Sequence, residues 1–201
     1  MTELFKQFKT AFILFIVLTI ITGIIYPAVI TLFSQTFFSW KANGSIIKQD
    51  NKPVGSFLIG QSFTDPQFFW GRPSATSPYP YNADNSSGSN LALSNPAYVT
   101  LIEHRVDKYK KYSDQAYIPV DLLTASGSGL DPDISPSAAI YQIPRVAKAS
   151  GIPENTVRQL VLSFIQKRTF NVLGEPRVDV LALNLALNRL EKTDGNGKPK
   201  P

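Results

Sequence analysis

Residues 10–40 read TAFILFIVLTIITGIIYPAVITLFSQTFFSW and contain no charged side chain. The densest part, residues 11–33, holds 23 positions, and fifteen of them are Leu, Ile, Val or Phe. As a helix rising about 1.5 Å per residue it would cover roughly 34 Å, enough to cross a hydrocarbon layer of about 30 Å. The sequence therefore predicts a transmembrane helix, which Pro27 is expected to kink without ending it.

A cleaved secretory signal or a buried core helix can also contain a long apolar run. Secretory signals have apolar regions of about 7 to 15 residues that end in small residues at the cleavage site, and residues 34–38 offer no such site. A core helix fits an apolar run of about 10 to 14 residues better than this one. We therefore expect an uncleaved membrane anchor.

The anchor divides the chain into four predicted segments. They are a short N-terminal tail at 1–9, the transmembrane helix and its exit at 10–40, a soluble domain at 41–192 and a disordered tail at 193–201. Lysines flank the span on both sides, so the positive-inside rule does not choose an orientation. Long downstream domains cross membranes largely regardless of charge, which permits a cytoplasmic N-terminus and an extracytoplasmic soluble domain.

Composition excludes several classes of function. The chain has no cysteine, which excludes a disulfide framework, a thiolate metal site, a cysteine nucleophile and a lipid-modified cysteine anchor. The net charge is +5, but the basic residues are dispersed and form no cluster larger than Lys108, Lys110 and Lys111. The charge therefore favours solubility, and no nucleic-acid partner is predicted.

Short strands and several helices without a strict strand–helix alternation predict one α+β domain after the span. The expected elements are a hairpin over 45–48 and 54–59, a long ordered loop over 60–96, a helix over 95–112, a strand over 120–124, a helix from 135 to 151, a helix from 153, a strand over 177–180 and a helix over 181–190. Pro144 should kink or break its helix near the middle, and Asp179 should cap the last one.

The loop over 60–96 is rich in Gly, Pro, Ser and Asn with interleaved aromatic residues. It is too long for an idle connection and too aromatic for a disordered linker, so we expect it to be ordered by packing and to carry the function. Aromatic residues and arginine dominate interface energies, which favours docking to a partner. The predicted contacts are Phe68, Phe69, Trp70 and Arg72, joined by Ser89 and Asn90; the two phenylalanines would equally suit the domain's own core.

Catalytic and metal-binding patterns are weak. Ser45 and Lys48 match a serine acyl-enzyme spacing, but they fall in the expected hairpin. The only histidine, His104, lies on the polar side of a helix and suits the surface better than a Ser-His-Asp triad. Asp131 and Asp133 could hold a hard cation, although a turn before the next helix is favoured. No catalytic residue and no metal ligand is predicted; a membrane-tethered extracytoplasmic serine hydrolase is the alternative function.

A serine–glycine turn is the one feature that suggests a nucleotide. Residues 126–129 read SGSG but lack the lysine of a phosphate-binding loop, so a flexible turn after a strand is favoured. Gln142 and Arg145, three apart on a helix, could present a polar pair to a partner or an anion, or belong to a salt-bridged helix surface. A nucleotide-binding regulator would use Ser126, Gly127, Ser128 and Gly129 together with Gln142 and Arg145.

Long blocks of the sequence carry a family resemblance. In chain order they are 55–61 (GSFLIGQ), Phe69, 71–75 (GRPSA), 81–83 (YNA), 88–91 (GSNL), 125–132 (ASGSGLDP), Gln142, 145–147 (RVA), 173–178 (LGEPRV) and 180–184 (VLALN). Together they resemble the C subunit of the bacterial Kdp potassium-transporting ATPase, the KdpC family, over nearly the whole chain. Two positions depart from the family pattern: Pro144 interrupts a helix that usually runs on, and Asp179 stands where an Asn is usual.

The resemblance implies a single-pass accessory subunit in the bacterial inner membrane. Its implied partners are the lipid bilayer, a channel-like potassium-conducting subunit and a P-type ATPase subunit that carries the phosphorylated aspartate. The implied roles are to stabilise this assembly and to act as a catalytic chaperone that raises the ATPase subunit's affinity for ATP. No cofactor is implied for this chain itself: ATP is reached through the ATPase partner, and K⁺ is the ion that the complex transports.

Overall fold

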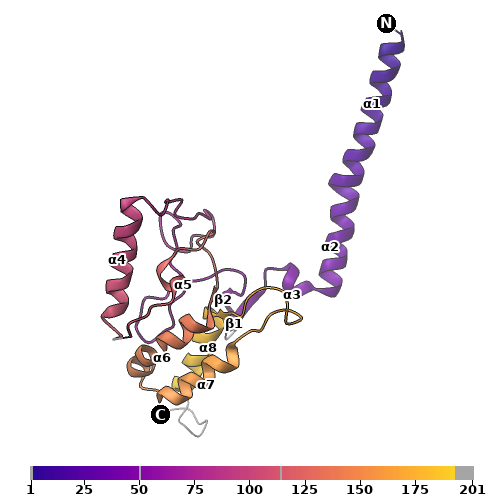
Figure 1. Ribbon diagram of the computed structural model, residues 1–201. Coiled ribbons are helices and arrows are strands. Elements are labelled where there is room, and N and C mark those ends of the chain that lie inside the picture. The colour runs from indigo at the N-terminus through magenta and orange to yellow at the C-terminus, as the bar shows by residue number, and fades with distance from the viewer. Residues whose placement is uncertain (1, 50, 114, 193–201) are drawn as a thin grey trace. The chain divides into compact units, whose positions relative to one another are not determined.

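The computed structural model describes residues 2–49, 51–113 and 115–192 and divides into two units between Ile46 and Ile47. The predicted tail at 193–201 lies outside the described residues. Each unit is described by itself. Figure 1 labels the helices α1 to α8 and the strands β1 and β2.

The first unit is a helical rod. It comprises α1 (Thr2–Ile20), a π-helical turn η1 (Ile21–Ile25), α2 (Tyr26–Phe37) and the short α3 (Ser39–Ala42). The helical run Glu3–Phe37 is 35 residues long and apolar enough to cross a membrane, with none of its most apolar window buried. Helical structure thus begins at Thr2, inside the segment expected to be a tail.

The predicted effect of Pro27 is visible in η1. Proline has no N–H to donate, and its ring crowds the carbonyl group four residues earlier, which here is that of Gly23. The wider π turn at Ile21–Ile25 directly precedes this position and relieves that crowding. The helix then continues to Phe37, so the prediction that Pro27 does not end it is confirmed.

The second unit is a mixture of helices and short strands, which confirms the α+β class. Its elements are β1 (Ile46–Gln49), β2 (Lys52–Ser56), α4 (Pro96–Lys110), α5 (Val120–Leu123), β3 (Asp133–Ile134), α6 (Pro136–Ser150), α7 (Glu154–Phe164), β4 (Val178–Asp179) and α8 (Val180–Lys192). Strands β1 and β2 pair with each other, and β3 pairs antiparallel with β4, with Ile134 opposite Val178.

Helix ends follow the capping residues identified in the sequence. The side chain of Asn95 accepts a hydrogen bond from the Ala97 N–H at 2.9 Å, and that of Ser135 accepts one from the Ala138 N–H at 3.1 Å. Gly151 ends α6 with a left-handed φ of +71°. Asp179 accepts a hydrogen bond from the Ala182 N–H at 2.6 Å, which confirms it as the cap of α8.

One expectation about secondary structure was wrong, and one alternative of another is excluded. Residues 120–124 were expected to form a strand, but they form the helical turn α5, in which the Thr124 N–H donates to the Val120 carbonyl. So short an apolar run does not distinguish the two conformations. Pro144 was expected to kink or break its helix. The break is excluded, because α6 is one helix from Pro136 to Ser150, with the proline on its exposed side.

The core of the second unit lies between α6, α7, α8 and the long loop. Its fully buried side chains include Ile143, Val157, Val161, Leu183 and Leu187 from the three helices, and Phe69 from the loop. Residues 60–95 contain no helix or strand but contribute Phe69 and Trp70 to this core. The prediction that packing orders this loop is therefore confirmed.

Candidate functional site

Two buried amide side chains fasten the long loop to the helices. Asn184 of α8 accepts a hydrogen bond from the Phe69 N–H at 2.8 Å and donates one to the Phe69 carbonyl at 2.9 Å. Gln142 of α6 binds Trp70 in the same way, at 2.8 Å and 3.1 Å. Each amide thus satisfies the backbone donor and acceptor of one loop residue, as a neighbouring strand would. We call Gln142 and Asn184 the amide clamp.

Arg145 extends this clamp to the preceding residues of the loop. Its guanidinium donates to the carbonyls of Pro66 and Phe68 and, at 2.6 Å, to the side-chain oxygen of Gln142. Its central carbon lies 3.7 Å from the centre of the Trp70 ring, a cation–π contact. Burial lowers the pKa of Arg145 to about 10, which leaves it charged at neutral pH.

Helix α4 and the residues just after it supply the other neighbours of Trp70. The ammonium group of Lys108 lies 4.0 Å from the Trp70 ring centre, and the rings of Tyr109 and Tyr112 are each 5.5 Å away. Burial, and then the positive charge of Arg145, lower the pKa of Lys108. Two cations and two tyrosines therefore share one indole ring, which ties α4 to α6 through the loop.

This arrangement changes the interpretation of the predicted partner contacts. Phe69 is 0% and Trp70 is 3% exposed, so both belong to the core instead of presenting an interface. Phe68 is half-buried, and its ring lies 5.6 Å from that of Phe63. The other predicted contacts nearer the surface are Arg72 and Ser89, both half-buried, and Asn90, which is exposed.

The two aspartates after the serine–glycine turn have structural partners. Asp131 pairs with Arg72 at 3.1 Å and accepts a hydrogen bond from the Asp133 N–H, as expected of a turn. Asp133 pairs with Arg177 at 3.0 Å. Nearby, the Tyr81 hydroxyl donates to the Arg72 carbonyl, and burial raises the pKa of this tyrosine to about 12. Within the described residues no group of three acidic, His or Cys side chains could hold a metal ion.

The serine–glycine turn uses its polar groups to hold the long loop. The Ser126 side chain accepts from the Gly129 N–H at 2.8 Å, and the Ser128 side chain accepts from the Leu130 N–H at 3.1 Å. The Ser128 carbonyl accepts from the Ser87 N–H at 3.0 Å. The turn thus contacts residues 73–88, whereas Gln142 and Arg145 contact residues 66–70. These two sets, predicted to act together on a nucleotide, bind different parts of the loop.

Gln142 and Arg145 are also not the salt-bridged surface pair that their spacing allowed. Gln142 and Arg145 are both buried, and they face the loop. Sequence reasoning missed Asn184 altogether. A signal was present, because Asn184 lies between Leu183 and Leu187 on the apolar side of α8, where an amide needs a polar partner.

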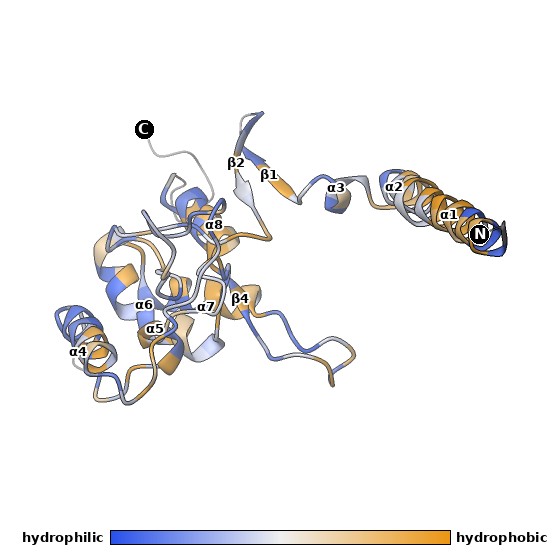
Figure 2. Cartoon of the chain, turned by 90° about the horizontal axis from the view of Figure 1, so that it is seen from above, coloured by the Kyte–Doolittle hydropathy of each residue, from blue (hydrophilic) through white to orange (hydrophobic). Residues whose placement is uncertain are grey.

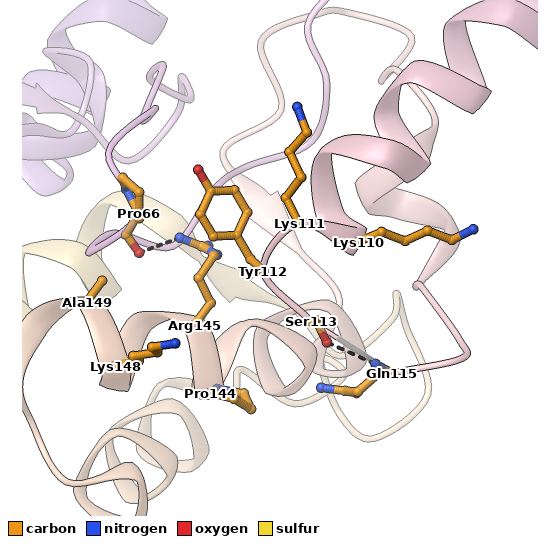
Figure 3. Close-up of a pocket in the computed structure, with 10 residues that line it drawn as sticks. All are labelled: Pro66, Lys110, Lys111, Tyr112, Ser113, Gln115, Pro144, Arg145, Lys148 and Ala149. Atoms are coloured by element: carbon orange, nitrogen blue, oxygen red, sulfur yellow. Dashed lines mark hydrogen bonds between the residues drawn. The ribbon is translucent and has the colours of Figure 1, made fainter.

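A hollow of about 870 Å³ lies beside Arg145. Of the described residues that line it, four are basic and none is acidic: Pro66, Lys110, Lys111, Tyr112, Ser113, Gln115, Pro144, Arg145, Lys148 and Ala149. Figure 3 shows Arg145 turned toward Pro66, while the ammonium groups of Lys110 and Lys111 point away from each other. The cations do not converge on one point, so the hollow is a basic surface and not a shaped anion site.

The residues considered for a serine hydrolase are dispersed. Ser45 is buried just before β1, where it adopts a positive φ of +49°. His104 is exposed on α4, as its place on the polar side of that helix predicts. Neither residue lies in the hollow beside Arg145.

Comparisons with known proteins agree with one another. Residues 8–189 match the model of the KdpC family, described as the c chain of K⁺-transporting ATPases. The chain is 54% identical over 186 residues to the potassium-transporting ATPase KdpC subunit of Paraburkholderia phytofirmans, covering 92% of this chain and 97% of that protein. It is 51% identical over 189 residues to the subunit of the same name from Herpetosiphon aurantiacus, covering 93% and 98%. For the subunit of Methylococcus capsulatus the identity is 51% over 187 residues, covering 92% and 98%.

Proposed function

The chain belongs to the KdpC family, the c chain of K⁺-transporting ATPases, and from this premise we propose that it is a non-catalytic accessory subunit of an ATP-driven, high-affinity potassium uptake pump. One membrane-length helix anchors a domain whose polar groups mainly hold its own long loop. That use of the polar groups is the observation that carries the proposal, because an enzyme needs such groups free to meet a substrate. Potassium conduction and ATP hydrolysis belong to its partners, a potassium-conducting subunit and a P-type ATPase subunit.

We propose that the subunit stabilises the assembly of these partners at the bacterial inner membrane. Its N-terminus is cytoplasmic and its second unit extracytoplasmic in this arrangement, which the length of the downstream domain permits. The loop surface then supplies contacts through Phe68, Arg72, Ser89 and Asn90, while Phe69 and Trp70 support that surface from the core. A loop held rigid by buried hydrogen bonds suits docking, because little side-chain freedom is lost on binding.

The effect on ATP is proposed to be indirect. A catalytic chaperone raises the ATPase subunit's affinity for ATP, but in and after the serine–glycine turn the N–H groups of Ser126, Gly129 and Leu130 already have acceptors within this chain. Gln142 and Arg145 are likewise engaged with the loop. An extracytoplasmic domain also has no ready access to cytoplasmic nucleotide. The higher ATP affinity is therefore transmitted through the membrane subunits of the pump.

Co-purification from a mild detergent tests the proposed assembly. The tagged chain should bring down the potassium-conducting and ATPase subunits, and the pump prepared without it should show a higher KM for ATP. Ser89→Arg, which enlarges a half-buried loop residue, should reduce recovery of the partners. Thr156→Arg on the exposed face of α7 is the matched control and should not. Failure of the wild-type chain to bring down either partner would refute the proposed function.

Orientation is tested separately with an introduced cysteine, because the chain has none of its own. Thr156→Cys should react with a membrane-impermeant maleimide on spheroplasts that are still intact. Reaction only after the membrane is opened would place the second unit on the cytoplasmic side. That result would overturn the proposed orientation and leave the membership of the pump untouched.

A further inference from the structure

Residues 166–177 form a hairpin that joins α7 to β4. Its base is closed by backbone hydrogen bonds between Gln166 and Arg177 at 2.8 Å and 3.1 Å. Near its end, Thr169 and Leu173 exchange two more bonds, each of 2.9 Å. Figure 2 shows this segment standing away from the helices of the second unit. We call residues 169–173 the hairpin tip.

The tip is apolar and exposed. Phe170 is 86%, Val172 is 72% and Leu173 is 60% exposed, so three large apolar side chains stand together within four positions. Leu93, by contrast, stands singly, and Phe57 and Leu58, 37% and 60% exposed, form only a pair. Isolated exposed apolar residues are ordinary, but a contiguous group marks a surface that meets another apolar phase.

The backbone conformation at Phe170 suits asparagine or glycine better than phenylalanine. Phe170 has a φ of +54° and Asn171 a φ of +59°, the left-handed region. Asparagine and glycine adopt this region readily, whereas a bulky aromatic residue there is strained. Because the Phe170 ring is almost fully exposed, it gains no burial that would offset this strain. An aromatic side chain retained at a strained, exposed position points to a contact made outside this chain.

The tip can enter an apolar medium with most of its backbone donors satisfied. The N–H groups of Thr169 and Leu173 bond across the hairpin, that of Asn171 donates to the Arg168 carbonyl, and that of Val172 donates to the Thr169 carbonyl. Unpaired backbone groups are what makes irregular chain costly in lipid. The Arg168 guanidinium also bonds both side-chain oxygens of Glu175 at 2.6 Å, which braces the hairpin below the tip.

The second unit is joined to the membrane-length helix by a short link. Only eight residues, 38–45, link the end of α2 to the start of β1. Even fully extended, they would span at most about 28 Å. Lys167 is exposed two residues before the tip and suits anionic headgroups. Three apolar side chains are also far fewer than the roughly 20 to 30 residues that each side of a standard protein interface contributes.

We propose that the hairpin tip inserts into the membrane interface as a second, shallow membrane contact of this chain. Phe170, Val172 and Leu173 lie at the boundary between headgroups and acyl chains, and Lys167 meets the anionic headgroups. This contact requires only the anchored chain and a bilayer. It is therefore independent of the proposed role in the pump.

The test uses the full chain alone, reconstituted into vesicles of phosphatidylcholine and phosphatidylglycerol. Val172→Cys carries a polarity-sensitive fluorophore and leaves Phe170 in place, and Leu93→Cys is the control for a single exposed apolar residue. Quenchers attached near the lipid headgroups should quench the label at 172 at least about threefold more than the label at 93, and aqueous iodide should show the reverse order. Adding Phe170→Asp and Leu173→Asp to Val172→Cys should abolish the difference.

Three results would overturn the proposal. One is a label at 172 that iodide reaches as readily as the label at 93, which leaves the tip in water. Another is a label shielded from both quenchers in the chain alone, which means that protein covers it. The last is a label at 172 that becomes shielded from both quenchers only when the pump partners are added, which means that the tip lies in a groove of a partner protein.

Discussion

The long loop at 60–95 and the hairpin at 166–177 are both connections that contain phenylalanine, but the side chain is placed in opposite ways. Phe69 is completely buried, whereas Phe170 is 86% exposed. The amide clamp satisfies the backbone of the loop from outside, so the loop can lie in the core. The hairpin satisfies its backbone from within and needs no neighbouring element. A connection whose backbone is paired by side chains of the core helices can thus bury its phenylalanine, whereas one whose backbone is paired within itself can leave its phenylalanine exposed.

The largest expected effect on stability is that of truncating Phe69, compared with the same truncation at Phe170. Phe69→Ala should lower the free energy of unfolding by about 3–5 kcal/mol, because it removes a fully buried ring and leaves a cavity. Phe170→Ala should change it by less than about 0.5 kcal/mol, since the ring is exposed. Urea unfolding of the full chain in a mild detergent, followed by near-ultraviolet circular dichroism, measures both. Equal effects at the two positions would remove the contrast between the regions.

Removing one half of the amide clamp should have the next largest effect. Asn184→Ala leaves the N–H and carbonyl of Phe69 buried without their partners, which should cost about 2–4 kcal/mol of unfolding free energy. The same urea titration measures it. Asn188→Ala, one turn later on α8 and only half-buried, is the control and should cost less than about 1 kcal/mol. A loss below about 1 kcal/mol for Asn184→Ala would mean that water replaces the clamp and that the loop is not held as the structure indicates.

The features that were predicted correctly from the sequence are those that depend on local patterns. The apolar run at 11–33, the caps at Asn95, Ser135 and Asp179, and the stop at Gly151 depend on residues close in the chain, and the structure follows them. Residues 120–124 show where local patterns become ambiguous, because five residues suit a helical turn as well as a strand.

The candidate site depended on pairings between distant residues. Asn184 bonds Phe69 across 115 positions, and Gln142 bonds Trp70 across 72. The apolar side of α8 indicates that Asn184 needs a polar partner, but nothing local identifies that partner. The sequence therefore suggested a surface role for Gln142 and an interface role for Trp70. Aromatic content showed correctly that the loop is ordered, but it could not distinguish a side chain that fills the core from one that meets a partner.

Asp179, in the strand β4 that directly follows the hairpin, is a buried side chain whose charge depends on pH, unlike the neutral side chains of the amide clamp. Burial, and then repulsion from Asp133, raise the pKa of Asp179 from an ordinary 3.8 to about 6. The folded chain thus binds this proton more tightly than the unfolded chain. The resulting stability is complete below pH 4 and is lost as pH rises through about 6. At neutral pH the site holds a charge that its surroundings disfavour.

Asp179→Asn should remove that charge and keep the cap, because the amide oxygen can still accept from the Ala182 N–H. We expect a gain of about 1–2 kcal/mol in unfolding free energy at pH 8 and no difference near pH 4. Urea titrations at both pH values measure it. Asp84→Asn, on an exposed loop residue, is the control and should change the unfolding free energy at pH 8 by less than about 0.5 kcal/mol. A gain of the same size at both pH values would show that packing, and not the titration of Asp179, is responsible.

The smallest expected effect concerns strain in the hairpin tip. Phe170→Asn should raise the unfolding free energy by about 0.5–1 kcal/mol, because asparagine tolerates the φ of +54° that phenylalanine adopts only with strain. Asn171→Phe, which places an aromatic residue at a φ of +59°, should lower it by a similar amount. The same detergent titration measures both, and the two changes should be opposite in sign. A loss with Phe170→Asn would mean that apolar contact of the ring, with the chain or with the detergent, outweighs the backbone strain, so that the hairpin resembles the loop. A gain would show that this chain gives up stability in order to display a phenylalanine in the one region, while it buries one for stability in the other.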